Sequence, residues 1–543
     1  MRKRTILLLV GALAVSASLV IGPAATATPE RQTAGTVVFG ADQEPNTLNW
    51  ATDSMLWMSI ITNKIHSSGS IYNDKAQLVP YLLDGKAKIV KTSPFTTTHK
   101  YKKNATWSDG KPLTGADFVT RFRVQMNPAN NVVTREGWDQ MTSVTAKGKS
   151  ATIVWKGKYA NWEEFNGAAP LPTSYLAGKD FNKVWADSIE PSSGPYRFVS
   201  WTKGQQIIIS KNPAWKAGPA SKLDRIVFRF IPNTATQFQA LRSGEVQITN
   251  PQFQLQIKDF LKDPKVQVQS KPGFFYEHID FQFGAKGHPA LKQPYVRQAI
   301  ITGINRGQIS QAIYGAVLPN PLPVLNSVHF MAFQADYEPV FGKWKFSQAK
   351  AISILKGKGC TGGPDKASAR NTDIFSCPGV GKLSFRFTTT TPNQVRALTF
   401  EIIQAQLKSV GIELVPRFGP APVVFGTTLP SRDWDMIMFT WLSSPPHSYS
   451  AGDLYECGGG QNDLLYCNRK YTKLMKKAKF EVDAAKRTAL VHQAEKYMAN
   501  DVPTIPLYNR PDFVLSYKNI KNVKGNPTQE AVTWNAEEWA LGQ

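Results

Sequence analysis

A short run of aromatic and hydroxyl-bearing residues follows a predicted buried strand. Residues 436–439 (MIMF) are typical of a buried strand, and residues 440–447 (TWLSSPPH) come directly after it. An aromatic ring, two hydroxyls and a rigid turn suit the holding of a polar ligand rather than its cleavage. Trp441, Ser443 and Ser444 are therefore candidate ligand-binding residues. The alternative is that Trp441 packs in the core and the serines cap a turn.

The same run also raises the question of catalysis, because a serine beside a histidine can act as a nucleophile with its base. Two prolines separate His447 from the serines, and no acid partner is evident. The sequence contains no GxSxG nucleophile elbow and no HExxH zinc motif. The remaining histidines, which show no metal-binding spacing, are His66, His99, His278, His288, His329 and His492. We therefore expect no enzyme activity, no bound metal and no cofactor.

The four cysteines form two local pairs, Cys360 with Cys377 and Cys457 with Cys467. Three connectivities are formally possible. Zinc sites usually combine close CxxC spacings with nearby histidines, and neither pair has these features. In an oxidising compartment, pairs that close short polar loops are expected to bond. We predict two structural disulfides, with a metal site as the alternative.

Strands and helices alternate around the candidate ligand-binding segment. Residues 383–387 alternate apolar and polar side chains as a strand does, and residues 412–415 predict a second strand. Between them, a helical period that stops at Gly411 is formed by Val395, Leu398, Ile402, Ala405 and Leu407. Such a βαβ unit predicts parallel strands with a right-handed connection. Ligands of open α/β sheets bind beyond the carboxyl ends of the strands, which is where the segment after Phe439 lies.

The N-terminus has the three parts of a secretory signal peptide. Residues 2–4 are cationic, residues 6–21 are apolar, and residues 25–27 (ATA) are small. We predict cleavage after Ala27 and export to the extracellular side or cell envelope, on the periplasmic or cell-wall side of the membrane. The alternative is an uncleaved anchor, although the apolar run is shorter than the roughly 20 residues that a membrane span needs. No cysteine lies near the cleavage site, so no lipid anchor is expected.

Length, composition and charge indicate a large, basic, globular protein. The chain has 543 residues, which at roughly 150 per domain suggests about three to four structural units. Hydrophobic residues make up 42% and charged residues 19%, a globular composition. The formal charge is +24, and removal of residues 1–27 lowers it only to +21. The basic residues are dispersed, so we expect no nucleic-acid partner. An anionic cell wall could retain the protein through this charge.

Eight segments spread in order over almost the whole mature chain carry recognisable motifs. The most specific is residues 103–118 (KNATWSDGKPLTGADF), which is similar to the pattern "kgvkWsDGkpltaeDv". The others are residues 45–49, 193–198, 211–215, 241–246, 296–306, 434–441 and 502–508. Together they resemble the extracellular solute-binding proteins of ABC importers, specifically the oligopeptide, dipeptide and nickel-binding family, family 5.

The most specific motif also predicts local structure by itself. Asp109-Gly110 supplies the residue with positive φ that a tight turn needs. Thr114 is a suitable helix N-cap ahead of Asp117 and Phe118. We therefore interpret residues 107–118 as scaffold rather than as a ligand contact.

The resemblance implies an α/β, two-lobed periplasmic-binding-protein-like fold of the class II type, with an extra subdomain inserted in lobe I. Lobe I would take residues 28–275 and 505–543, with the inserted subdomain near residues 75–185. Lobe II would take residues 276–504. The strands near residues 274–283 and 504–507 would cross between the lobes, and a hinge of two adjacent connections lets lobes close over a solute.

The resemblance also implies site residues. Peptide-binding members hold the ligand's amino terminus with an Asp at the position of Ser444, and the loss of a charge-assisted hydrogen bond there can cost roughly 1.5 to 3 kcal/mol. Asp280 could substitute, and the alternative is that Asp280 is an exposed strand carboxylate. Aromatic and amide side chains suit the walls of a cleft, and the candidates are Trp441, Tyr508, Asn509 and Trp138, with Trp57 instead expected in the core.

We therefore predict a monomeric, secreted substrate-binding protein of an ABC transporter. It would capture peptides or peptide-like solutes in a cleft between the lobes and deliver them to permease subunits in the membrane. The alternatives are a receptor for another large polar solute, such as an oligosaccharide, a glycolipid or a metal chelate, or a secreted enzyme or wall-associated adhesin.

Overall fold

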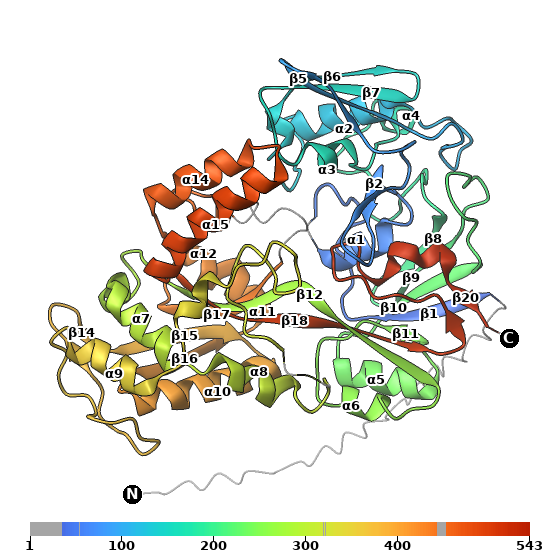
Figure 1. Cartoon of the computed structure of the whole chain (residues 1–543). Coiled ribbons are helices and arrows are strands. Elements are labelled where there is room, and N and C mark those ends of the chain that lie inside the picture. Colours follow the sequence, from blue (N-terminus) through green and yellow to red (C-terminus); the bar gives the residue numbers. More distant parts are fainter. Residues whose placement is uncertain (1–34, 54, 319, 321, 443–451, 543) are drawn as a thin grey trace, which may run out of the picture. The chain divides into compact units, whose positions relative to one another are not determined.

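The computed structural model describes residues 35–53, 55–318, 320, 322–442 and 452–542 (Figure 1). The predicted signal peptide at residues 1–27 lies outside the described residues, as do Ser443, Ser444 and His447. Among the described residues, every helix is too short or too polar to form a bilayer-spanning segment.

A ten-stranded mixed sheet runs through the described part of the chain (Figure 1). Its strands, in spatial order, are β16 (Glu413–Gly419), β15 (Ser384–Thr390), β17 (Met436–Leu442), β12 (Val266–Phe281), β18 (Thr504–Tyr517), β11 (Ile248–Thr249), β1 (Thr36–Ala41), β10 (Arg225–Phe230), β9 (Gln206–Lys211) and β8 (Tyr196–Thr202). The two segments predicted to cross between lobes are therefore β12 and β18, paired antiparallel in the middle of the sheet.

The βαβ unit predicted around residues 383–415 is confirmed. β15 and β16 pair in parallel through α10 (Gln394–Ser409), and β17 begins alongside β15 in parallel. Asn393 caps α10 by accepting a hydrogen bond from the Arg396 backbone N–H at 3.0 Å. Of the five residues of the predicted helical period, Leu407 is buried but Leu398 and Ala405 are exposed, and the buried face of α10 instead includes Phe400 and Ile403.

Helices cover the sheet and pack on one another. α7 (Pro294–Gly303) packs against α9 (Gln348–Lys356), and α8 (Arg306–Tyr314) contacts α10 and β18. α14 (Arg469–Lys479) and α15 (Ala484–Asp501) form a hairpin (Figure 1). The other helices and strands are α1 (Leu56–Thr62), α3 (Trp162–Asn166), α4 (Thr173–Leu176), α5 (Thr234–Ser243), α6 (Ile257–Phe260), α11 (Ala421–Val423), α12 (Leu429–Ser431), α13 (Gly452–Tyr455), β2 (Ser70–Tyr72), β3 (Leu78–Pro80), β13 (Ser376–Cys377), β14 (Gly381–Lys382), β19 (Ile520–Lys521) and β20 (Ala540–Leu541).

A separate antiparallel sheet lies in the region predicted as an inserted subdomain. Its strands, in spatial order, are β4 (Lys88–Thr92), β5 (Phe95–Lys100), β7 (Ser150–Trp155) and β6 (Met141–Lys147), and α2 (Gly115–Met126) packs on β6 and β7. The predicted cap of α2 is confirmed, because Thr114 and Asp117 form a capping box. The predicted turn is also confirmed, since Gly110 has a φ of +84°.

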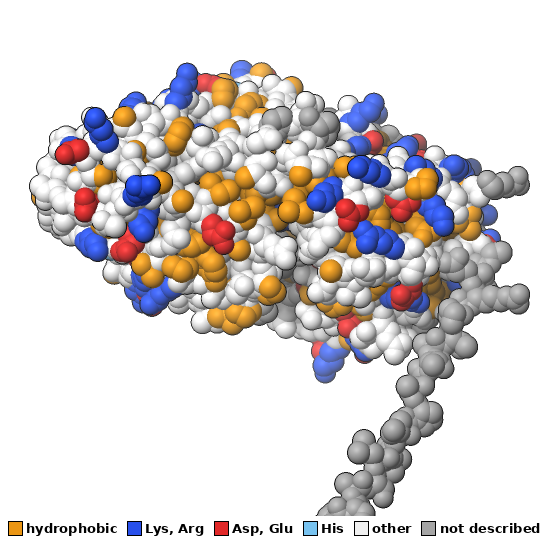
Figure 2. Space-filling view, turned by 90° about the horizontal axis from the view of Figure 1, so that it is seen from below, with side chains coloured by type: hydrophobic (Ala, Val, Ile, Leu, Met, Phe, Trp, Pro, Cys, Tyr) orange, Lys and Arg blue, Asp and Glu red, His pale blue; other side chains and the backbone are white. Residues whose placement is uncertain are grey.

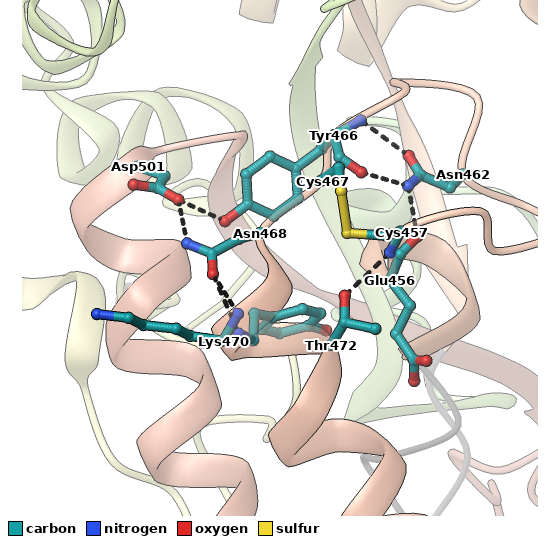
Figure 3. Close-up of a disulfide and its surroundings, with 10 residues drawn as sticks. Glu456, Cys457, Asn462, Tyr466, Cys467, Asn468, Lys470, Thr472 and Asp501 are labelled. Carbon is teal, nitrogen blue, oxygen red and sulfur yellow. Dashed lines mark hydrogen bonds between the residues drawn. A yellow bond between two sulfur atoms is a disulfide. The ribbon is translucent and has the colours of Figure 1, made fainter.

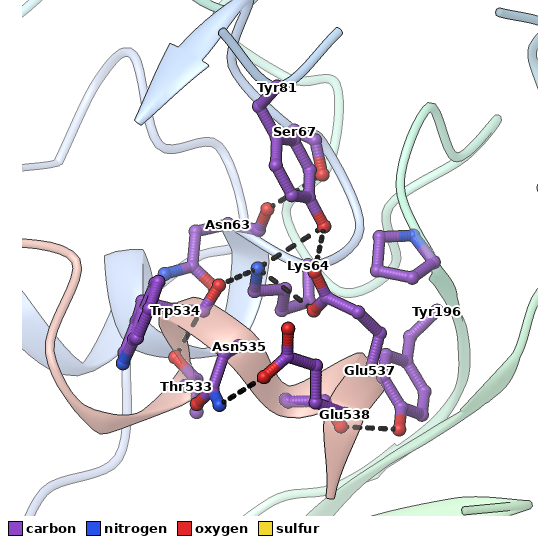
Figure 4. Close-up of polar contacts among 12 residues, drawn as sticks. Asn63, Lys64, Ser67, Tyr81, Tyr196, Thr533, Trp534, Asn535, Glu537 and Glu538 are labelled. Atoms are coloured by element: carbon purple, nitrogen blue, oxygen red, sulfur yellow. Dashed lines mark hydrogen bonds and ion pairs between the residues drawn. The ribbon is translucent and has the colours of Figure 1, made fainter. Parts of the chain in front are cut away.

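A buried ion pair ties the C-terminal segment to the end of α1 (Figure 4). Lys64 Nζ lies 3.1 Å from Glu537 Oε2, and both side chains are at most 5% exposed. Tyr81 donates its hydroxyl to the other Glu537 oxygen at 2.7 Å, and Lys64 also donates to the Trp534 carbonyl. Each charge is thus paired and hydrogen-bonded, which is the condition under which charges can be buried.

We expect Lys64→Met to destabilise the protein strongly, because it leaves the Glu537 carboxylate buried without its ammonium partner. Removal of one partner of a buried pair costs about 3–5 kcal/mol in the free energy of unfolding, which urea unfolding measures. The matched control is Lys100→Met, which breaks the exposed pair with Asp84 and should cost less than about 1 kcal/mol. Similar losses in the two variants would contradict this role of the buried pair.

Candidate functional site

The described residues enclose a cavity of about 550 Å³ where four strands of the large sheet end. Residues 42–43 follow β1, residues 250–253 follow β11, residues 390–393 continue from β15, and residues 420–421 follow β16. The other lining residues are Leu56, Trp57, Ile60, Phe275, Arg396, Phe425, Arg510, Pro511, Asp512, Asn526, Thr528 and Ala531. This position agrees with the rule that α/β sheets bind ligands beyond the carboxyl ends of their strands.

A buried ion cluster adjoins the cavity wall. Glu277 of β12 forms a salt bridge with Arg396 Nε of α10 at 2.7 Å. Thr440 of β17 donates its hydroxyl to the second Glu277 oxygen. The Thr440 oxygen also accepts from Arg396 Nη2 at 3.0 Å and from Arg510 Nη1 of β18 at 3.2 Å. Arg396 Nη1 completes the cluster by donating to Thr390 Oγ1 at 2.5 Å. The cluster therefore joins three strands of the sheet to α10 and to the end of β15.

The cluster favours the ionised form of Glu277. Burial raises the pKa of a carboxyl, but Arg396 and Arg510 outweigh burial and lower the pKa of Glu277 below its ordinary value of 4.5. Burial likewise lowers the pKa of Arg510, but the combined attraction of Glu277, Asp512 and the hydroxyls of Tyr314 and Tyr508 raises that pKa above its ordinary value. Two guanidiniums thus share one carboxylate. Both arginines line the cavity, where Arg510 also interacts with the carboxylates of Asp42 and Asp512.

Two carboxylates also line the cavity. Asp42 accepts hydrogen bonds from the Trp57 indole and from Gln252 Nε2, the latter at 3.3 Å. Asp512 Oδ1 accepts from Asn250 Nδ2 at 2.9 Å. Burial raises the pKa of both carboxyls above 3.8, and these hydrogen bonds partly oppose it. The cavity therefore offers carboxylates as well as guanidiniums to a ligand.

The apolar part of the cavity wall is aromatic. Its rings are Trp57, Phe253, Phe275 and Phe425. Trp57 packs edge-on against Phe39, with 5.5 Å between ring centroids, and Phe425 packs edge-on against Phe439 at 5.7 Å. Trp57 is buried on α1, as expected, and it also contributes to the cavity. Fixed rings beside placed polar groups are typical of ligand pockets.

Trp441 lies beside the ion cluster but not on the described cavity wall. Its ring is half-buried, stacks on His278 with 6.0 Å between centroids, and meets Phe439 edge-on at 4.9 Å. The preceding residue, Thr440, belongs to the ion cluster. Successive side chains of a strand point to opposite faces, so the two residues face opposite sides of the sheet.

Tyr508 and Asn509 also lie one or two positions from a cavity residue. Tyr508 is fully buried and packs edge-on against Tyr314 at 5.4 Å. Asn509 Oδ1 accepts a hydrogen bond from the Ala332 backbone N–H at 3.3 Å. The next residue, Arg510, lines the cavity. Asn509 therefore holds the chain in place beside a residue that can meet a ligand.

Asp280 and Trp138 lie away from the described cavity wall. The interpretation of Asp280 as an exposed carboxylate is wrong: it is 1% exposed, and its Oδ2 lies 3.0 Å from His278 Nε2. Trp138 lies in the core of the β4–β7 region, between Phe118 and Phe165, with the Arg121 guanidinium over its ring.

The sequence patterns do not single out the charged residues of the cavity and of the adjoining ion cluster. Arg510 and Asp512 stand in a polar run, residues 509–512 (NRPD), inside the otherwise apolar strand β18. Glu277 is likewise a charged residue within the apolar end of β12. Charged residues at buried strand positions require partners, and this is the signal that could have identified them.

Both predicted disulfides are present. Cys360 bonds to Cys377 and Cys457 to Cys467, with S–S distances of 2.04 and 2.09 Å. Around the second bond, the Asn462 side chain donates to the Glu456 and Tyr466 carbonyls, and Thr472 accepts from the Cys457 backbone N–H (Figure 3). In the described residues, no three His, Cys, Asp or Glu side chains are grouped as a metal site would need.

Comparison with known proteins assigns the class. The chain superimposes on a periplasmic EDTA-binding protein, EppA, with a TM-score of 0.84 and 21% identity over 94% of this chain and 97% of the other. It also superimposes on NikZ from Campylobacter jejuni, solved with Ni(L-His), with a TM-score of 0.79 and 18% identity over 93% and 99% of the chains. The predicted two-lobed α/β fold of periplasmic binding proteins is therefore confirmed.

Residues 83–463 match the family model of bacterial extracellular solute-binding proteins, family 5. The chain therefore belongs to family 5 of the bacterial extracellular solute-binding proteins. A curated relative, the oligopeptide-binding protein AppA of Bacillus subtilis (strain 168), is 24% identical over 534 residues, which cover 94% of this chain and 92% of the relative. The chain is accordingly a solute-binding protein of an ABC importer that acts outside the cytoplasm with a membrane permease, and not an enzyme.

We expect Glu277→Gln to lower the free energy of unfolding by about 3–5 kcal/mol at pH 7, because two buried guanidiniums lose their carboxylate. The folded-state pKa of Glu277 lies below 4.5. Its contribution is therefore complete above pH 4.5 and is lost as the pH falls through the folded value. Urea unfolding from pH 7 downward measures both effects, and the difference between wild type and variant should shrink in acid.

The matched control for this prediction is Glu245→Gln, which breaks the more exposed salt bridge with Arg229. We expect it to cost less than about 1 kcal/mol. A Glu277→Gln penalty that is as small as the control's, or that stays constant into acid, would show that the cluster does not depend on the ionised carboxylate.

Proposed function

We propose that the cavity binds peptides or peptide-like solutes with both a positive and a negative group, for delivery to the permease. The observation that supports this most is the composition of its wall. Guanidiniums of Arg396 and Arg510, carboxylates of Asp42 and Asp512, and aromatic rings line one cavity of about 550 Å³. A free peptide offers an ammonium, a carboxylate and apolar side chains, which match these three features.

The named relative supports the same solute class. AppA of Bacillus subtilis is described as an oligopeptide-binding protein. In this chain, Asp42 and Asp512 would accept hydrogen bonds from a ligand's ammonium group, and Arg396 and Arg510 would donate to its carboxylate. Charge-assisted hydrogen bonds of this kind are shorter and stronger than neutral ones.

The proposal includes the lobe boundaries and the working state. Lobe I would take residues 28–275 and 505–543, with the inserted subdomain near residues 75–185, and lobe II residues 276–504. The two lobes would close over the solute about β12 and β18. The mature chain would work as a monomer without a lipid anchor.

A metal chelate with carboxylate groups is the second candidate. The two guanidiniums shared by Glu277 leave hydrogen-bonding capacity for an anionic chelator. The solved structures of an EDTA-binding protein and of NikZ with Ni(L-His) have the same fold. Such a ligand would use Arg396 and Arg510 but would have no ammonium group for Asp42.

Native mass spectrometry of gently purified protein, followed by denaturation, tests the solute class. A mixture of short peptides released on denaturation is the expected result. A single chelator or sugar would contradict the peptide proposal. Where the protein is empty, calorimetry with defined peptides and with Ni(L-His) and Fe-EDTA makes the same distinction.

We expect Asp42→Asn to weaken binding of a free peptide by about 10- to 150-fold, the equivalent of the roughly 1.5–3 kcal/mol of a charged hydrogen bond. The affinity for the N-acetylated form of the same peptide should change little, because that peptide has no ammonium group. Isothermal calorimetry measures both affinities in a double-mutant cycle. The matched control is Asp187→Asn, an exposed carboxylate paired with Lys203 outside the cavity wall, and it should leave both unchanged. Equal losses for free and acetylated peptides would contradict an ammonium site at Asp42.

A further inference from the structure

The helical hairpin of α14 and α15 carries a concentrated basic surface. α14 buries Tyr471, Thr472, Met475 and Ala478 against the rest of the chain. Apart from Leu474, its remaining positions are cationic, and these cations are largely exposed. We define the basic face as Arg469, Lys470, Lys473, Lys476 and Lys477 of α14 together with Lys496 of α15.

Two hollows lie on this face, and two lysines line both of them. The first, of about 840 Å³, is lined by Lys473, Lys476 and Lys477 together with the apolar side chains of Phe480 and Leu490. Its lining residues are Cys457 and residues of α14, of α15 and of the segment between these helices, so it lies apart from the strand ends of the large sheet.

The second hollow, of about 460 Å³, is lined by Lys470, Lys473 and Lys477 together with Leu474 and Tyr497. Lys473 and Lys477 belong to both hollows and therefore stand between them. Each hollow thus combines several ammonium groups with an apolar floor.

The cations of the α14 part of this face outnumber the nearby carboxylates, such as Glu456, whose charge interacts with Lys476, and Glu481. Lys496 pairs with Glu338 at 3.0 Å, and Lys479, which lies outside the face, pairs with Glu136 at 2.8 Å. None of the five basic-face residues of α14 forms a salt bridge within the described ranges. Of the residues that line the two hollows, Glu481 is acidic. The face is therefore strongly positive.

This concentration differs from the charge pattern on another side of the molecule. The face in Figure 2 carries Lys and Arg side chains that stand apart and alternate with Asp and Glu. Dispersed charges of both signs maintain solubility, whereas a cluster of one sign attracts an oppositely charged surface.

We propose that the basic face binds the headgroups of anionic phospholipids at the surface of a bilayer. The positive charge of the face favours an anionic partner. The apolar side chains in the two hollows favour an anion that also has an apolar part. Phe480 is 44% exposed at the end of α14, and aromatic and aliphatic side chains among lysines are typical of helices that lie in the membrane interface. A phospholipid supplies a phosphate for the ammonium groups and glycerol and acyl carbons for Phe480 and Leu490.

This surface gives the chain a function that is separate from solute binding. A binding protein that works with a membrane permease gains from residence at the membrane, because its local concentration near the permease rises. Reversible electrostatic binding would supply that residence whatever solute occupies the cavity. The proposal therefore does not depend on the peptide assignment.

Sedimentation with vesicles tests the proposal on the folded chain from residue 28 onward. Vesicles of phosphatidylglycerol mixed with phosphatidylcholine should bind the protein at low ionic strength, and vesicles of phosphatidylcholine alone should not. Each basic residue near an anionic leaflet contributes about fivefold to partitioning. The triple variant K473Q/K476Q/K477Q should therefore bind about 100-fold more weakly. In about 1 M salt, where the Debye length is about 3 Å, the wild type should also dissociate.

The matched control is K86Q/K88Q/K91Q, which removes the same charge from three exposed lysines on and beside β4. It should keep most of the vesicle binding, and circular dichroism should show both triples folded. Phe480→Ser provides a second measurement and should weaken vesicle binding severalfold without changing the net charge. Equal losses in the two triples would overturn the proposal, since binding would then follow net charge. Binding to inorganic polyphosphate without binding to anionic vesicles would also overturn it.

Discussion

The pairing of β12 with β18 is the constraint on which the rest of the structure depends. These strands run antiparallel from Val266 opposite Tyr517 to Asp280 opposite Thr504, in the middle of the ten-stranded sheet. Their ladder is interrupted where Pro272 faces Pro511, because neither proline has an N–H to donate. Phe275 and Arg510 lie at this interruption and both line the cavity. The interruption of the ladder therefore leaves the side chains of Phe275 and Arg510 at the cavity wall.

Much of the fold follows from local signals in the sequence. The strand, helix and strand of residues 384–419 were predictable because each element has its own period and cap. The cap at Thr114 was predictable because its partner, Asp117, is three residues away. The two disulfides were predictable because each closes a short loop, with the paired positions 17 and 10 residues apart in the sequence. The predicted period of α10 included Leu398, which is exposed, and omitted Phe400 and Ile403, which are buried. A helix that is apolar on more than one side does not reveal which side its neighbours will cover.

The candidate site was predicted less well, because it is assembled from distant segments. Trp441 and Tyr508 were predicted from sequence, and they lie on β17 and β18, the strands that also carry the cluster residues Thr440 and Arg510. In a strand, a shift of one residue moves a side chain to the opposite face. The hydrogen-bond partners of Glu277 are Arg396 and Thr440, which lie more than 100 positions away in the sequence. No spacing within the sequence encodes such a contact.

The ion cluster is not explained by stability alone. Replacement of a buried ion pair by apolar residues is often neutral or stabilising, so stability alone does not account for Glu277 and its two arginines. The cluster holds both guanidiniums in fixed positions through Thr390 and Thr440. A free side chain loses about 0.5–1.5 kcal/mol of conformational entropy when a ligand immobilises it. In the proposed function, arginines that are already fixed avoid this cost when a solute binds.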